Sequence, residues 1–238
     1  MRHVHALAIH IGADVLAWPG HAHLGVLHSC RDTLTRMTRL TRAAGLQEQR
    51  WLVGTQATCA AVVETITHGA TALAPKGLLV VTFAGHTVRH HDQTFWCLHD
   101  GELPLGEVAA CFAGAAASAQ IVVVADTCYG TALQRYAELA ATLVLIAACG
   151  ADQHTMIRRT SAFIGRLEQL TYPDGIRHAA CTTYRWLHEH LQHQTPDVER
   201  PEVWTNRAAV WRQRPFALPT HAGDGRGACR ARQARTGP

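Results

Sequence analysis

The sequence contains one lysine, no C-x-x-C pair and no long uninterrupted apolar run. Its longest apolar stretch, 111–125, is broken by Ser118 and Gln120, so we expect no membrane span. The basic, apolar and cleavage regions of a secretory signal peptide are also missing. The eight cysteines are scattered along a chain long enough to need no disulfide framework. These absences favour a reducing, cytoplasmic environment.

Outside its C-terminal end, the chain has almost no net charge. The net charge is +4, but six arginines and a single acidic residue follow position 211, so the preceding part holds 16 basic and 17 acidic residues. A near-neutral body offers no broad phosphate-binding face, and we do not expect nucleic acid as a partner. The length of 238 residues fits one domain. We assign 1–220 to that domain and 221–238 to a disordered basic tail.

Short runs rich in leucine or β-branched residues alternate with amphipathic patterns, which predicts parallel strands joined by crossover helices. The runs 78–81 and 121–124 are apolar at every position, as in central strands covered on both faces. The predicted strands are 5–11, 50–53, 77–83, 121–125 and 142–147. One helix is predicted between the first two strands, ending near Gly45, and others at 58–68, 105–117, 131–141, 161–170 and 183–191.

An imidazole and a thiol each follow one of these strands. His86 comes after the strand 77–83, and Cys128 after the strand 121–125. Ligands of parallel sheets bind beyond the carboxyl ends of the strands, so the fold would bring these side chains together if the two strands are neighbours. A thiol with a pKa near 8.5 is only roughly 3% thiolate at pH 7, and an adjacent histidine corrects this. We predict that Cys128 attacks a carbonyl, that His86 acts as base and then acid, and that the Cys128 amide helps to hold the oxyanion.

Five segments in this order resemble the caspase-like cysteine peptidases of the metacaspase and bacterial orthocaspase branch. HALAIHIG at 5–12 is similar to the first strand of that family, and LHSCRD at 27–32 is similar to its G-C-x-N-D-A turn. FAGH at 83–86 is similar to its F-S-G-H-G segment, which holds the catalytic histidine, and DTCYG at 126–130 is similar to its D-x-C-H-S-G nucleophile segment. AACGADQ at 147–153 is similar to the end of its next strand. The resemblance implies a caspase-like three-layer αβα sandwich around a mostly parallel sheet.

The resemblance also implies a substrate preference. It places Asp32 and Asp126 in the S1 pocket, where carboxylates receive an arginine or lysine side chain, whereas animal caspases use basic residues for aspartate. We therefore expect cleavage of a protein substrate after Arg, and self-cleavage at Arg158 or Arg159 or in the tail. Thr87 stands where the family has the glycine whose amide serves the oxyanion hole. A backbone donor needs no glycine, so we expect the amide of Thr87 to keep that role.

Bacterial relatives of this kind often act in regulated cell death or antiphage defence, which implies an activating signal or partner protein. The other class of function considered is a binding or scaffold module of the same fold without turnover, for which Thr87 is the supporting feature. A nucleotide binder is the weakest alternative, because both G-x-G-x-x-G and G-x-x-x-x-G-K-[ST] are missing.

Simpler roles exist for the same residues. Asp32 could only cap the first helix, and Asp126 could only orient the nucleophile turn. Four cysteines are expected to be inert packing: Cys59, Cys97, Cys111 and Cys181. The 17 histidines include HEHLQH at 188–193, but the H-E-x-x-H spacing fails at Gln192 and no zinc quartet is seen, so we expect neither metal nor cofactor.

Overall fold

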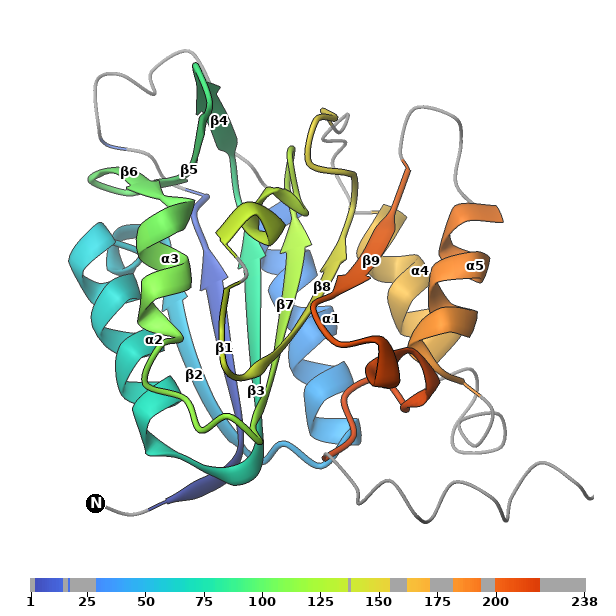
Figure 1. Ribbon diagram of the computed structural model, residues 1–238. Helices are drawn as coiled ribbons and strands as arrows, with labels where there is room; N and C mark the ends of the chain where they lie inside the picture. The colour runs from blue at the N-terminus through green and yellow to red at the C-terminus, as the bar shows by residue number, and fades with distance from the viewer. Residues whose placement is uncertain are drawn as a thin grey trace, which may run out of the picture.

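The computed structural model describes residues 3–14, 17, 29–136, 138–154, 162–171, 182–193 and 200–218. Its centre is a six-stranded sheet of order β2-β1-β3-β7-β8-β9 (Figure 1). The strands are β1 (Val4–Gly12), β2 (Glu48–Val53), β3 (Leu73–Ala84), β7 (Gln120–Asp126), β8 (Thr142–Ala147) and β9 (Glu202–Thr205). The first five are mutually parallel, and β9 pairs antiparallel with β8. The five predicted strands and the mostly parallel sheet are confirmed, whereas β9 was not predicted.

Helices cover both faces of this sheet (Figure 1). They are α1 (Ser29–Ala43), α2 (Cys59–Ala72), α3 (Leu105–Cys111), α4 (Ala162–Thr171) and α5 (Tyr184–His193). Side chains of α2 and α3 pack with one face of the sheet into one apolar cluster. Those of α1, α4 and α5 pack with the opposite face into a second cluster. The architecture is therefore a mixed α/β sandwich of three layers, as predicted.

Local sequence signals explain where two of the helices begin and end. Leu34, Met37 and Leu40 are buried along one face of α1, and Gly45, just beyond its end, has a φ of +93°. A positive φ is easily adopted by glycine, which accounts for the helix end at this point. The hydroxyl of Thr58 caps α2 by accepting a hydrogen bond from the amide of Ala61 at 3.2 Å.

A second, three-stranded antiparallel sheet was missed by the sequence analysis. It consists of β4 (Thr87–His90), β5 (Gln93–Leu98) and β6 (Gly101–Pro104), in the order β4-β5-β6. In Figure 1 it lies at the upper end of the molecule, at the carboxyl ends of the parallel strands. Trp96 of β5 stacks on Phe83 of β3, with ring centroids 4.2 Å apart and planes 8° from parallel. The small sheet is thus packed onto the strand that leads to His86.

Two predicted helices are shorter than expected. The segment 105–117 is helical only as far as Cys111, and 131–141 forms only a short 3₁₀ helix, η3 (Ala132–Tyr136).

The described part ends at residue 218, so the predicted tail 221–238, the domain limit at 220, Cys181 and the self-cleavage candidates Arg158 and Arg159 lie outside it. Within the described ranges, no helix is both long and apolar enough to cross a membrane.

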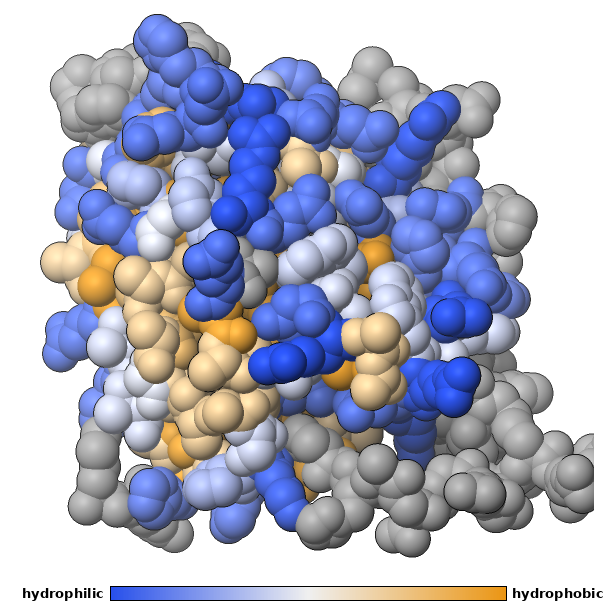
Figure 2. Space-filling model, viewed as in Figure 1, coloured by the Kyte–Doolittle hydropathy of each residue, from blue (hydrophilic) through white to orange (hydrophobic). Residues whose placement is uncertain are grey.

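Figure 2 shows, in the same view as Figure 1, pale orange apolar side chains gathered on the lower left of the molecule, where α2 and α3 lie, and mainly blue hydrophilic side chains at the upper end. The carboxyl end of the sheet is thus the polar end on this face.

Candidate active site

The two strands that lead to His86 and Cys128 are direct neighbours. β3 and β7 pair in parallel, and the last pair in their register is Ala84 with Asp126. His86 and Cys128 each lie two residues beyond that pair, at the same edge of the sheet. Both residues are partly exposed. The predicted adjacency of the two strands is confirmed, while the direct contact between imidazole and thiol stays a prediction.

The loops that carry these residues are joined through two threonines. The hydroxyls of Thr87 and Thr127 hydrogen-bond to each other at 2.5 Å, and both residues are buried. Thr87 directly follows His86, and Thr127 directly precedes Cys128. A buried hydroxyl pair costs free energy when it is broken, so the contact holds the two loops at a fixed separation.

The turn that contains Cys128 has an unusual backbone. Tyr129 has a φ of +52°, in the left-handed region that a residue with a side chain seldom adopts. Its amide donates a hydrogen bond to the carbonyl of Gln153 at 2.8 Å, which holds it there. At Gly130 an added Cβ would lie 2.6 Å from the Cβ of Ala147, so only glycine fits. Strained backbone of this kind gathers at functional sites.

The loop after β8, residues 148–154, contacts both sides of this region. The hydroxyl of Tyr129 and Nε2 of His154 are 2.5 Å apart. The carboxylate of Asp152 pairs with Arg89 of β4 at 2.5 Å and with Arg135 of η3 at 3.0 Å. Sequence reasoning found a family-like segment at 147–153 but none of these contacts. Their partners lie 17 to 63 residues away, beyond the range of local patterns.

Asp126, one of the two predicted pocket carboxylates, faces the N-terminal part of α1. Its Oδ2 accepts a hydrogen bond from the hydroxyl of Thr33 at 2.5 Å. Burial, followed by the charges of Asp126 and Asp14, raises the pKa of the Cys30 thiol to about 12. Asp126 therefore lies close to the first turn of α1, which contains Asp32. That the two carboxylates form a substrate pocket stays a prediction.

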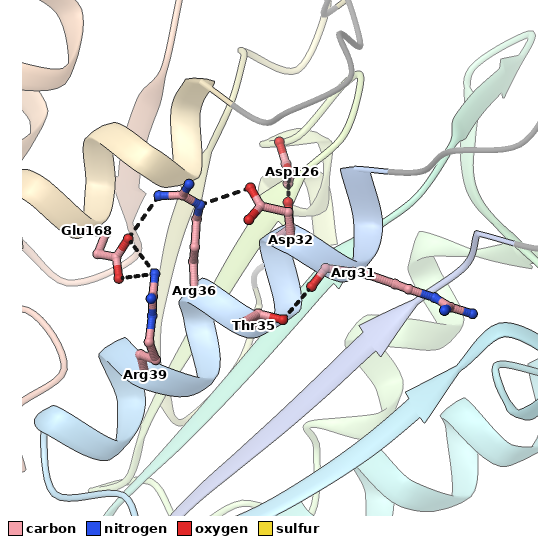
Figure 3. A network of polar contacts seen from close by, with 8 residues as sticks. Arg31, Asp32, Thr35, Arg36, Arg39, Asp126 and Glu168 are labelled. Carbon is pink, nitrogen blue, oxygen red and sulfur yellow. Dashed lines mark hydrogen bonds and ion pairs between the residues drawn. The ribbon is translucent and has the colours of Figure 1, made fainter.

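Asp32, the other predicted carboxylate, already binds a guanidinium. Its Oδ2 accepts a hydrogen bond from Nε of Arg36 at 2.9 Å, one turn further along α1 (Figure 3). Arg36 also pairs with Glu168 of α4 at 3.1 Å, and Arg39 pairs with the same glutamate at 2.9 Å. Asp32 thus belongs to an ion-pair network between α1 and α4. A substrate guanidinium would have to share or replace Arg36 there.

A third carboxylate near this edge was missed by the sequence analysis. Asp14 follows β1, and its side chain is only 7% exposed. Its Oδ2 accepts a hydrogen bond from Nε of Arg31 at 3.2 Å, while Oδ1 is buried without a hydrogen-bond partner. The rule that singled out the ends of the strands 77–83 and 121–125 applies equally to the end of β1, and would have found it.

Metal ligation finds no support in the described ranges, where no group of three or more His, Cys, Asp or Glu could hold an ion. Two histidines of HEHLQH, His188 and His190, have other contacts. His188 Nδ1 accepts a hydrogen bond from the amide of Val203 at 3.2 Å, and His190 Nδ1 lies 2.8 Å from the carbonyl of Trp186.

Comparison with known proteins shows a likeness of fold. No family model and no curated protein matches the chain. Among solved structures, the crystal structure of GSU0716 from Geobacter sulfurreducens superimposes with a TM-score of 0.75 and 22% sequence identity, covering 90% of this chain and 99% of that one. At this identity the likeness concerns the fold alone. It extends over nearly the whole of both chains, so the α/β architecture is that of a complete known structure.

Proposed function

We propose that the protein is a cysteine endopeptidase of caspase-like fold that cleaves protein substrates after arginine or lysine. The observation that carries this proposal is the parallel pairing of β3 with β7, which puts His86 and Cys128 at equal positions beyond the last register pair. A histidine and a partly exposed cysteine on adjacent loops are the residue types that thiol acyl transfer needs, which supports the proposal.

In the proposed reaction, His86 takes the proton of Cys128, and Sγ then bonds to the carbonyl carbon of the scissile peptide. The C–N bond breaks, and the proton passes from His86 to the departing amine. Water, deprotonated by His86, next hydrolyses the thioester and releases the free cysteine. Cys128 is covalently regenerated at the end, so neither cofactor nor metal enters the cycle.

The oxyanion would be held by the amides of Cys128 and Thr87. The amide of Cys97 donates to the carbonyl of His86 at 3.0 Å, so this pair is of the hydrogen-bonded type in the β4–β5 ladder. Hydrogen-bonded and non-hydrogen-bonded pairs alternate, so the next pair, Thr87 with Trp96, leaves the Thr87 amide pointing away from β5. Because β4 is the edge strand of the small sheet, no strand of that sheet lies on the side to which this amide points.

The preference for a basic P1 residue rests on the carboxylates at this edge. Asp126 lies two residues before the nucleophile, and its partner Thr33 is a neutral hydroxyl. Asp32 is the neighbour of Thr33 in α1, although its present partner is Arg36. A guanidinium that binds between these carboxylates would gain charge-assisted hydrogen bonds in a partly buried setting.

The biological role proposed is that of a regulated cytoplasmic effector in bacterial cell death or antiphage defence, switched on by a signal or a partner protein. The ion pair between Arg36 and Asp32 is compatible with such regulation, because it occupies a pocket carboxylate before any substrate arrives.

The test compares fluorogenic peptides that end in Arg, Lys or Asp, with the purified protein and with Cys128→Ala, His86→Ala and the control Cys59→Ala. We expect cleavage after Arg and Lys only, a loss of at least about 10³-fold in kcat/KM for the first two variants, and wild-type activity for the control. Thermal melts of each variant check folding. Cleavage that survives in Cys128→Ala, or a wild-type protein that cleaves none of the peptides, overturns the proposal.

A binding module without turnover is the second candidate. It is favoured by the observation that both predicted pocket carboxylates already have partners, Thr33 and Arg36. Saturable binding of an Arg-ending peptide by the wild-type protein, with the peptide recovered intact, would select this function over the peptidase.

A further inference from the structure

Cys97 lies beside the proposed catalytic histidine. Its amide donates to the carbonyl of His86 at 3.0 Å, and the neighbouring register pair is Thr87 with Trp96. His86 and Cys97 are therefore directly opposite in an antiparallel ladder. Residues in such positions project to the same side, with Cβ atoms about 4.5–5.5 Å apart. Cys97 thus shares a face of the small sheet with His86.

The side chain of Cys97 lies outside the apolar cluster to which its two neighbours in β5 belong. Its neighbours Trp96 and Leu98 pack into the apolar cluster beneath α2 and α3, and Cys97 is not a member of that cluster. Alternation along β5 directs it to the opposite face, where Glu102 of β6 stands across from it. Cys97 is nonetheless completely buried. It is a thiol enclosed beside the site and unused by the proposed cleavage reaction.

The thiols of Cys97 and Cys128 lie within electrostatic reach of one another. Burial first, then the charge of Glu102, and also the ionised form of Cys128 raise the pKa of Cys97 to about 12. The backbone supports the same placement, because Thr127 before Cys128 hydrogen-bonds with Thr87, the residue paired with Trp96 before Cys97. The contact between Thr127 and Thr87 thus links the loop of Cys128 to the hairpin that contains Cys97.

From this arrangement we propose that Cys97 is a resolving thiol, which forms a reversible disulfide with Cys128 after a hydroperoxide has oxidised Cys128. The inference rests on the proposed function insofar as it treats Cys128 as the reactive thiol of the peptidase. It assigns a redox modification site to the same loop pair and makes the peptidase active only in its reduced form.

The chemistry balances in two steps. The Cys128 thiolate attacks one oxygen of the hydroperoxide, the O–O bond breaks, and the products are the sulfenic acid of Cys128 and water or an alcohol after protonation. The sulfur of Cys97 then attacks the sulfur of Cys128, the S–O bond breaks, and hydroxide leaves with the proton of Cys97 as water. An external dithiol reverses the result by reducing the disulfide to two thiols.

The environments of the two cysteines set the order of these steps. Cys128 is partly exposed and is reached first by a dissolved oxidant, whereas Cys97 is buried and protonated. Cys97 therefore stays a thiol until its partner is oxidised. His86, opposite Cys97 in the ladder, is placed to take up the proton that Cys97 releases.

The test treats the purified full-length protein with hydrogen peroxide, blocks free thiols, and identifies linked peptides by mass spectrometry without reduction. We expect a Cys97–Cys128 crosslink, a mass lower by two hydrogen atoms, and full recovery of Arg-peptide cleavage after dithiothreitol. In Cys97→Ser we expect Cys128 to gain two or three oxygen atoms and activity to stay lost after reduction. Cys149→Ser is the matched control, because Cys149 also contacts the nucleophile turn, 3.5 Å from the carbonyl of Thr127, and should behave as wild type.

A crosslink of Cys128 to any other cysteine, or equal over-oxidation of Cys128 in the wild type and in Cys97→Ser, overturns the proposal. The crosslink is read in the wild-type protein, so it does not depend on how well the variants fold. It is also read without a substrate. A reduced protein that cleaves peptides but forms no crosslink refutes only the redox site, whereas a reduced protein that cleaves nothing refutes the peptidase.

Discussion

Thr87 and Thr127 join the two loops of the candidate active site through a hydrogen bond between their buried hydroxyls. Valine keeps the shape of threonine but cannot form this bond, so Thr127→Val leaves the hydroxyl of Thr87 unsatisfied. We expect this variant to lose about 1–3 kcal/mol of unfolding free energy, measured by urea denaturation. Because the loops also hold His86 and Cys128, kcat for an Arg peptide should fall by about 10- to 100-fold.

The double variant Thr87→Val with Thr127→Val serves as the control for stability. Removing both partners leaves no buried hydroxyl unsatisfied, so it should regain much of the lost unfolding free energy but not the activity. Additive losses of stability in the double variant would show that the hydroxyls do not depend on each other.

The two predicted pocket carboxylates should contribute unequally to the binding of a basic P1 residue. Asp126 accepts a hydrogen bond from the neutral hydroxyl of Thr33, whereas Asp32 is bound by the guanidinium of Arg36. Asp126→Asn should therefore weaken kcat/KM for an Arg peptide by about 30-fold or more, equivalent to about 2 kcal/mol. The effect of Asp32→Asn should be smaller. Steady-state kinetics with Arg and Asp peptides measures both.

Arg36→Ala extends this comparison, because it removes the guanidinium that now occupies Asp32. We expect it to lower KM for the Arg peptide while leaving the Asp peptide uncleaved. If Arg36→Ala left KM unchanged and Asp32→Asn matched Asp126→Asn, Arg36 would not compete for the pocket.

Acid should destabilise the protein through His10. Burial lowers the pKa of this histidine from 6.5 to about 4, and its Nδ1 lies 3.3 Å from the hydroxyl of Thr82. Below about pH 6.5 the unfolded chain takes up a proton that the folded chain refuses until about pH 4, so stability falls as the pH falls through this range. The full difference corresponds to roughly 3 kcal/mol.

Urea unfolding at pH 7.5, 6 and 4.5 measures how the free energy of unfolding changes with pH, and His10→Gln is the test variant. Glutamine does not titrate, so the variant should have a flatter pH profile than the wild type. Burial also lowers the pKa of His188, so some slope should remain in the variant and decrease further in His10→Gln with His188→Gln. An unchanged profile in His10→Gln would mean that His10 does not govern the acid sensitivity.

The main sheet could be predicted because its strands are apolar at successive positions, and burial on both faces leaves that pattern in the sequence. The small sheet could not, because its strands are four to six residues long and partly exposed. The Asp100-Gly101 dipeptide, at the turn from β5 into β6, was nevertheless a turn signal. Recognising it would have placed a hairpin between the predicted strand 77–83 and the predicted helix 105–117.

In the candidate site, too, some features could be predicted from local sequence patterns and others could not. The positions of His86 and Cys128 follow from strand order, which local patterns indicate. The partner of Asp32 is another helix residue four positions away, but the α1–α4 network depends on Glu168, more than 120 residues later. Likewise the link between Arg89 and Asp152 spans 63 residues. Such pairs depend on the finished packing of the chain, which a single sequence does not reveal.

The antiparallel strand β9 limits how copies of this chain could associate. It covers the outer side of β8 along four residues, from Val144 to Ala147, and so takes up the backbone groups that a second molecule could otherwise pair with. A strand this short is itself a poor template for further pairing. Growth of the sheet from one molecule into the next is therefore disfavoured at this border.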